Sequence, residues 1–133
     1  MIFIDTGAFL ARSLKNDSYH LKALQFWEKI TKQDITVVTS QFVISETLTL
    51  FHRWAGTAFA VEKARNLYES QVLKIIRTTR NEEYEAIDVM EKYADQNLSF
   101  TDCVSFVIMR RQKIQQAFSF DKHFQIAGFE LWS

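Results

Sequence analysis

The sequence contains no proline, only three glycines and a single cysteine. Without proline-rich or glycine-rich stretches there is no candidate linker, so we expect one domain that spans residues 1–133. The one cysteine, Cys103, excludes an internal disulfide. Because it lies within an apolar run, we interpret it as a small buried side chain and not as a reactive thiol. This cysteine usage suits a reducing compartment, and we expect a cytoplasmic protein.

Long hydrophobic runs are also missing. No stretch of about eighteen apolar residues occurs, and no cationic segment precedes the apolar N-terminus, which argues against a membrane-spanning helix and a secretory signal. The composition is instead that of a globular protein, with 47% hydrophobic and 24% charged residues. Twelve phenylalanines argue against disorder, and the chain is long enough to bury a core.

Short apolar runs alternate with segments of helical periodicity along the whole chain. The apolar runs predict strands at residues 1–4, 35–39, 72–76, 117–120 and 129–132. Helices are predicted at residues 8–14 and 19–32, after Ser40, after Thr57, from Asn81 to Ala94 and from Phe100 to Arg111. Strands and helices interleaved in this way predict a three-layer α/β/α domain around a mostly parallel sheet.

The same periodicity predicts helix caps and packing faces. The candidate N-caps are Asp17 or Ser18, Ser40, Thr57 and Ser99. The predicted packing faces consist of Leu21, Leu24, Trp27 and Ile30 in the second helix, Val61, Ala64, Leu67 and Tyr68 in the fourth, and Tyr84, Ile87, Met90 and Ala94 in the fifth.

The last long helix is apolar from Cys103 to Met109 except for Ser105, so we expect it in the centre of the domain. Asp102 then lies in the first turn of a buried helix, where a charged carboxylate is rare unless it has a partner. One explanation is a capping box with Ser99, which has the required spacing. The other is a metal ligand, which requires partners elsewhere in the chain.

Three further acids lie in or beside apolar sequence. Asp5 and Asp121 each follow an apolar run, and Glu46 shares the side of its helix that holds much of the apolar stripe. Each has an ordinary alternative role, as a turn residue, an N-cap and a solvated helix edge, respectively. Taken with Asp102, they form a candidate cation site, because a lone buried charge is costly. Oxygen ligands without a Cys or His cluster favour Mg²⁺ or Mn²⁺ over zinc.

Four short motifs carry these acids: Ile4-Asp5-Thr6, Ser45-Glu46, Phe100-Thr101-Asp102 with Ser105, and Ser119-Phe120-Asp121-Lys122-His123-Phe124. In this order, and over essentially the whole chain, the sequence resembles the PIN-domain nucleases, in particular the small VapC-like toxins of toxin–antitoxin pairs. Two positions depart from the family pattern. Gly7 stands where relatives often carry Ser or another small polar residue, and Ser119 replaces a common Thr.

The resemblance implies a five-stranded parallel sheet and a site formed by Asp5, Glu46, Asp102 and Asp121. It assigns Thr6 and Ser105 as hydroxyls that support these acids. The implied activity is hydrolysis of RNA phosphodiester bonds with Mg²⁺ or Mn²⁺, in which the ion activates water and offsets phosphate charge. The implied partners are an RNA substrate, a small antitoxin protein and a second copy of the chain in a homodimer.

The formal net charge of zero does not exclude an RNA partner. Setting aside the four acids of the site leaves twelve acidic residues against sixteen Lys and Arg, so the remaining surface is positive. Candidate phosphate contacts are Arg12, Lys15, Arg53, Arg110, Arg111 and Lys122, each of which has a solvated side chain as its alternative. For the antitoxin we expect an apolar groove formed by Phe51, Trp54, Phe59 and the helix of Trp27, with core packing as the alternative.

Other classes of protein fit the sequence less well. A receiver-like signalling domain needs an acid after the third strand, where Ile76-Arg77-Thr78 has none. A phosphatase of the haloacid-dehalogenase type needs Asp-x-Asp after the first strand, where Asp5-Thr6-Gly7 lacks the second acid. The three histidines are scattered and no nucleophile elbow occurs, so the sequence gives no support for a serine or cysteine hydrolase. The remaining alternative to a nuclease is a non-catalytic α/β module that binds another protein.

Overall fold

The computed structural model describes residues 1–132 and confirms the predicted order of strands and helices. The strands are Ile2–Ile4 (β1), Val37–Ser40 (β2), Leu73–Ile76 (β3), Gln116–Phe118 (β4) and Glu130–Leu131 (β5). The helices are Thr6–Ser13 (α1), His20–Lys32 (α2), Gln41–Ala55 (α3), Thr57–Glu69 (α4), Arg80–Lys92 (α5), Phe100–Arg111 (α6) and His123–Ile126 (α7), with a 3₁₀ turn at Ala94–Gln96. None of these helices is long and apolar enough to cross a lipid bilayer.

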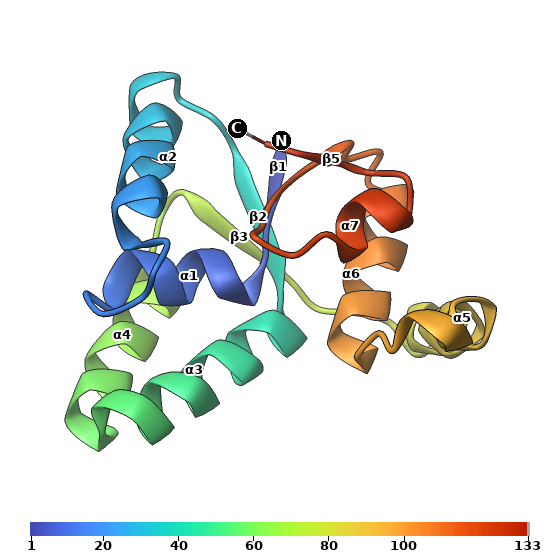
Figure 1. Cartoon of the computed structure of the whole chain (residues 1–133), viewed down its shortest axis with the longest axis horizontal. Helices are drawn as coiled ribbons and strands as arrows, with labels where there is room; N and C mark the ends of the chain where they lie inside the picture. Colours follow the sequence, from blue (N-terminus) through green and yellow to red (C-terminus); the bar gives the residue numbers. More distant parts are fainter. Residues whose placement is uncertain (133) are drawn as a thin grey trace.

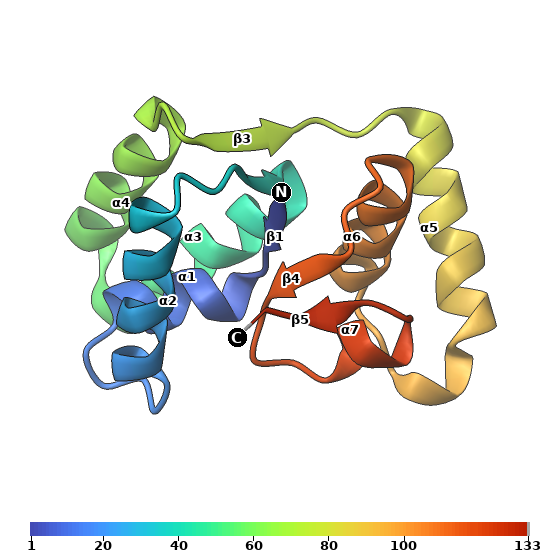
Figure 2. The same ribbon diagram turned by 90° about the horizontal axis from the view of Figure 1, so that it is seen from above.

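All strand pairs are parallel, and the strand order is β3-β2-β1-β4-β5. Figure 1 shows β1 and β2 at the centre, with α1, α2 and α4 on one side and α5, α6 and α7 on the other. Phe3 of β1 lies opposite Val38 on one side and Ala117 on the other. Helices α1 to α4 cover one face of the sheet and α5 to α7 the other (Figure 2), which is the predicted three-layer arrangement. The strand order reverses between β1 and β4, and in such sheets ligands bind beyond the carboxyl ends of the strands at this point.

Helix α6 is the most deeply buried helix of the domain, as its sequence predicts. Every residue from Cys103 to Met109 is buried. Phe106 packs edge-on against Phe124, with ring centroids 5.2 Å apart, and so joins α6 to α7. Burial raises the pKa of the Cys103 thiol to about 11, with the charge of Asp102 as a smaller cause, which confirms that this cysteine is not a reactive thiolate.

The predicted packing faces of the amphipathic helices are partly wrong. In α2, Leu21 is 76% exposed and Leu24 is also exposed; the buried residues are Ala23, Phe26 and Ile30. In α4, Val61 and Tyr68 are exposed. In α5, Tyr84, Ile87 and Met90 are exposed, whereas Ala86 and Val89 are buried. Periodicity favoured the stripe of larger side chains, but a small residue such as Ala86 lets two helices approach closely.

The helix caps agree with the sequence in two cases. Ser40 caps α3 by accepting a hydrogen bond from the Val43 N–H, and Ser99 caps α6. The other assignments are wrong. Helix α2 follows Tyr19, whose N–H donates to the Asp17 side chain. Gly56, with φ of 88°, precedes α4, and Thr79 caps α5 in a capping box with Glu82. Side chains other than hydrogen disfavour a positive φ, which explains why glycine occupies position 56.

The two faces of α5 give a direct test of the packing. Val89→Ala should lower the free energy of unfolding by about 2 kcal/mol, because it removes buried methyl groups and leaves a small cavity. Ile87→Ala, two residues away and 51% exposed, should change it by less than about 0.5 kcal/mol. Urea unfolding of both variants measures the difference. An equal or larger loss for Ile87→Ala would show that the predicted face is the buried one.

Candidate functional site

The structure brings all four predicted acids to one open cleft of about 870 Å³. Asp5 directly follows β1 and precedes α1, and Asp121 lies three residues after the end of β4. Asp102 comes from the first turn of α6, and Glu46 from α3. Since β1 and β4 are adjacent and parallel, the cleft lies at the point where the strand order reverses. Thr6, Lys122 and His123 also line it.

Ser119 links two of the acids across the β1–β4 pair. Its hydroxyl donates to Asp5 Oδ2 at 2.8 Å and accepts from the Asp121 N–H at 3.0 Å. Asp5 is 7% exposed and Ser119 is 4% exposed, so this connection is shielded from water. The Ser that replaces the family's common Thr therefore retains a hydroxyl at this position. Spacing in the sequence does not relate Ser119 to Asp5, because only the pairing of β1 with β4 brings the two residues together.

Asp102 forms the predicted capping box and also lines the cleft. One carboxylate oxygen, Oδ2, accepts from the Ser99 N–H at 3.3 Å, and the Ser99 hydroxyl accepts from the Asp102 N–H at 3.1 Å, which completes the capping box. The same carboxylate lines the cleft. A role in capping therefore orients the side chain toward the site and does not exclude a role there.

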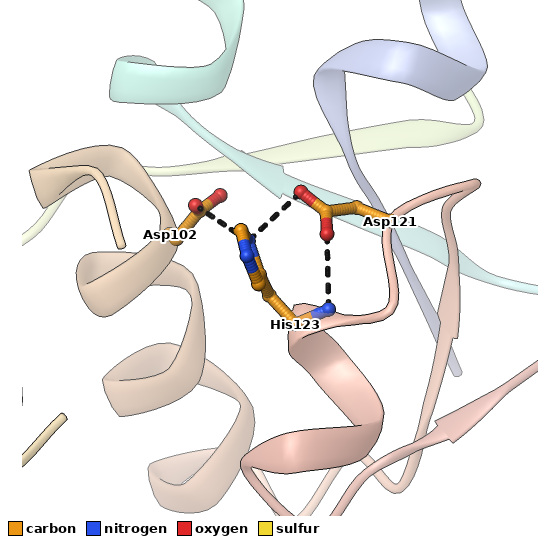
Figure 3. Close-up of side chains that lie close together, drawn as sticks. All are labelled: Asp102, Asp121 and His123. Carbon is orange, nitrogen blue, oxygen red and sulfur yellow. Dashed lines mark hydrogen bonds and ion pairs between the residues drawn. The ribbon is translucent and has the colours of Figure 1, made fainter. Parts of the chain in front are cut away.

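His123 lies between Asp102 and Asp121, as Figure 3 shows. Its Nδ1 is 3.0 Å from Asp121 Oδ2 and 3.6 Å from Asp102 Oδ2, without hydrogen-bond geometry to either. Its backbone N–H donates to Asp121 Oδ1 at 2.9 Å. One potential metal-binding atom from each of these three residues lies within 4.8 Å of the others. The sequence placed His123 in a motif but gave no reason to include it in the site.

The two supporting hydroxyls lie in different surroundings. The Thr6 hydroxyl is buried beside the cleft, near enough to Glu46 to lower the pKa of that carboxyl but without hydrogen-bond geometry to any group among residues 1–132. The Ser105 hydroxyl donates to the Thr101 carbonyl at 3.0 Å, one turn back in its own helix, and does not reach the acids. Glu46 is exposed at the rim, beside and not within the buried face of α3, which consists of Val43, Ile44, Thr47 and Phe51.

The carboxylates perturb one another electrostatically. Burial raises the pKa of Asp5 to about 7, and the charge of Asp102 adds to the effect. Partial desolvation of the Glu46 carboxylate at the rim raises its pKa as well, with a contribution from Asp102 and against the opposing effect of the Thr101 and Thr6 hydroxyls. The pKa of Asp102 is raised by burial and by Asp121, against the opposing hydrogen bond from Ser99. The cleft is therefore short of positive charge, which is the condition for binding a cation.

Only one of the six candidate phosphate contacts, Lys122, lines this cleft. Arg12 lies over the Trp27 ring at 4.4 Å. Arg110 donates to the Ala127 carbonyl, and Arg111 forms ion pairs with Glu85 and Glu82. These two arginines end α6, whose N-terminus carries Asp102, so they lie more than about 10 Å along the helix from the acids. Lys15 lines a separate hollow, and Arg53 is exposed on α3.

The expected apolar groove is largely absent among the described residues. Phe51 is 1% exposed and packs edge-on with Phe59, with ring centroids 5.3 Å apart, so both belong to a small second core. Trp27 is half-buried against Phe9. Trp54 alone is well exposed, at 59%, and lines a hollow of about 380 Å³ together with Lys15. Core packing thus explains most of this aromatic group.

Comparison with known proteins agrees with this geometry. The PIN domain model matches residues 2–130. The chain is 34% identical over 129 residues to the 23S rRNA-specific endonuclease VapC20 of Mycobacterium tuberculosis, in strains CDC 1551 and H37Rv, covering 97% of this chain and 95% of the relative.

Two solved structures extend the comparison. The crystal structure of Mycobacterium tuberculosis VapC20, described as a Sarcin-Ricin loop cleaving toxin, aligns with a TM-score of 0.89 at 32% identity and covers 97% of this chain and 96% of that one. FitAcB from Neisseria gonorrhoeae aligns with a TM-score of 0.74 at 11% identity, covers 100% of this chain and 97% of that one, and supports the fold alone. The chain therefore belongs to the PIN domain family, within which it is a VapC-like nuclease.

Proposed function

We propose that this protein is a metal-dependent endoribonuclease and the toxin of a toxin–antitoxin pair, with Asp5, Glu46, Asp102 and Asp121 as the metal-binding and catalytic acids. The observation that carries the proposal is the convergence of four carboxylates from separate elements on one cleft, three of them with raised pKa values. A protein-binding module does not require such a concentration of repelling charges. Catalysis by a divalent cation does.

The residues of the cleft fit Mg²⁺ or Mn²⁺. Carboxylate oxygens are the ligands that both ions prefer, and the buried Thr6 hydroxyl is a further oxygen that lines the cleft near Glu46. When bound, such an ion would activate water and offset charge on the phosphate. His123 supplies nitrogen, which these ions favour less, so we assign it to positioning Asp102 and Asp121 and not to the ligand set.

The side chains around the acids have separate tasks in this proposal. Ser119 holds the carboxylate of Asp5 through its 2.8 Å hydrogen bond, and the Ser99 N–H holds that of Asp102. Lys122, at the mouth of the cleft, would contact a substrate phosphate. The acids are thus preorganised before substrate arrives, which reduces the cost of assembling the site.

The similarity to VapC20 suggests which RNA to test as the substrate. VapC20 is named as specific for 23S rRNA and as cleaving the Sarcin-Ricin loop. Because identity of 34% extends over 97% of this chain, we propose ribosomal RNA with this loop as the first substrate to test. Incubation of ribosomes with the protein and Mn²⁺, followed by mapping of RNA ends, should show a single cleavage that EDTA abolishes. Cleavage that persists in EDTA would contradict a metal requirement.

Thermal melts separate metal binding from helix capping at Asp102. At a metal concentration about a hundredfold above Kd, wild type should gain about 2.7 kcal/mol of stability. Asp102→Asn keeps an oxygen for the cap but loses a charge, so it should lose most of this gain and the cleavage activity. Without metal it should be as stable as wild type or more stable, because like charges no longer repel.

Glu82→Gln is the matched control, because Glu82 occupies the same position in the capping box of α5 and does not line the cleft. This variant should retain the full metal-induced shift in melting temperature. Equal shifts in wild type and Asp102→Asn would leave Asp102 with the capping role alone.

The raised pKa of Asp5 predicts that the stability of the metal-free protein depends on pH. Its pKa is about 7 in the folded protein against an ordinary 3.8, so the folded state binds the extra proton between these values. Stability should therefore fall as pH rises through this window, by up to about 1.4 kcal/mol per pH unit, and level off above about pH 7. Urea unfolding in EDTA measures the slope. Asp5→Asn should flatten it, and a slope unchanged by the substitution would contradict the assignment.

The proposed protein partners are a small antitoxin and a second copy of this chain. For the antitoxin, Trp54 is the one residue of the expected groove that is well exposed in the described structure. Trp54→Ala should weaken inhibition by the protein encoded next to this gene, by roughly tenfold or more if Trp54 is an anchor residue, and leave RNA cleavage unchanged. Inhibition titrations measure both. Unchanged inhibition would exclude this contact.

A further inference from the structure

Three aromatic rings form a column at one side of the cleft. Phe26 and Phe120 are nearly parallel, at 11° and 6.3 Å between centroids. Tyr19 stacks on Phe120 at 4.3 Å and 5°. The column runs from the core to the surface, because Phe26 is 6% exposed whereas Tyr19 is 47% exposed. Its outer member thus presents a flat aromatic surface to solvent.

This column adjoins the acids directly. Tyr19 and Phe120 both line the cleft that contains Asp5, Glu46, Asp102 and Asp121. Phe120 is the residue before Asp121, and consecutive α-carbons are only about 3.8 Å apart. Lys122 comes directly after Asp121 and is the one Lys or Arg among the described residues that line the cleft. An aromatic surface, an acid and a cation thus occupy neighbouring positions of the chain.

Tyr19 differs from the other exposed tyrosines in having no cation over its ring. The exposed Tyr68 and Tyr84 each have an arginine within about 6 Å of the ring centre, Arg77 and Arg80 respectively. No such cation lies over the Tyr19 ring within residues 1–132. The Tyr19 N–H donates to the Asp17 side chain at 2.8 Å, which holds the backbone just before α2. The stack on Phe120 orients the ring, and Tyr19 remains 47% exposed.

We propose that Tyr19 and Phe120 form a stacking platform for an unpaired RNA base next to the phosphate that is cleaved. The proposal rests on the proposed ribonuclease function and names how that site holds its substrate. Unpaired bases stack on aromatic side chains, with a contribution of about 1–3 kcal/mol per base. With a base on Tyr19, the attached phosphate lies toward Lys122 and the acids. Bases within a duplex cannot reach the platform, so it favours loops and single strands.

The test is cleavage of two matched RNAs, one with the normal base and one with an abasic nucleotide beside the mapped cleavage position. On the normal RNA, Tyr19→Ala should lower kcat/KM by roughly 5- to 150-fold. On the abasic RNA, wild type and Tyr19→Ala should be similar. Tyr19→Phe keeps the ring and should restore the normal rate. Tyr84→Ala, which removes an exposed tyrosine of α5 that does not line the cleft, is the matched control and should have no effect.

Binding without cleavage separates this proposal from the proposed function. The probe is the same RNA with 2-aminopurine at the tested position, titrated in EDTA at low salt. Stacking should quench its fluorescence with wild type and Tyr19→Phe but not with Tyr19→Ala. Quenching by a protein that never cleaves RNA would overturn the ribonuclease proposal and leave the platform standing.

Two results would overturn the platform. The first is an equal loss of rate on the normal and abasic RNAs for Tyr19→Ala, which would show that Tyr19 only supports the fold. The second is unchanged cleavage combined with weaker inhibition by the antitoxin, which would assign the aromatic surface to a protein partner. Circular dichroism of Tyr19→Ala and Tyr19→Phe shows whether both variants are folded.

Discussion

The burial of carboxylates that also repel one another is the constraint on which the site depends. Burial raises the pKa of Asp5, Glu46 and Asp102, the charge of Asp102 adds to the rise at Asp5 and Glu46, and the charge of Asp121 adds to that at Asp102. Such an arrangement is unfavourable in isolation, and it persists because the surrounding fold holds the backbone of each acid in place. Strands β1 and β4 position Asp5 and Asp121, and the buried helix α6 positions Asp102. A bound cation would remove the repulsion that the fold imposes.

Hydrogen bonds from two serines hold the carboxylates in the positions that the fold gives them. Ser119 connects Asp5 with the backbone of Asp121, and Ser99 connects its own N–H with the carboxylate of Asp102. Capping and catalysis are therefore not competing explanations of Asp102. A capping box orients the carboxylate at the N-terminus of the most buried helix, which is also where the ends of β1 and β4 bring Asp5 and Asp121.

The distribution of positive charge differs from what a count of residues suggests. Arginines at the end of α6 are engaged with α5 and with the Ala127 carbonyl, and Lys122 is the cation that lines the cleft. Beside Lys122, the recognition surface is aromatic, with the Tyr19–Phe120 stack at 4.3 Å. Neutral rings bind a nucleotide without adding charge next to the acids, so substrate binding and cation binding can occupy adjoining parts of one cleft.

The sequence by itself determined the order of the strands and helices and the burial of α6, because these depend on local periodicity. It also singled out the four acids that the structure brings to one cleft, from their places in or beside apolar sequence and from the family resemblance. Only the tertiary structure decided which stripe of α2 and α5 is buried, since two apolar stripes on one helix have the same period. It also decided the strand order, which places Ser119 beside Asp5, and the packing of α7 near α6, which places His123 between two acids. Contacts between residues as distant as Asp5 and Ser119 leave no periodic signal in a single sequence, and only the pairing of the strands creates them.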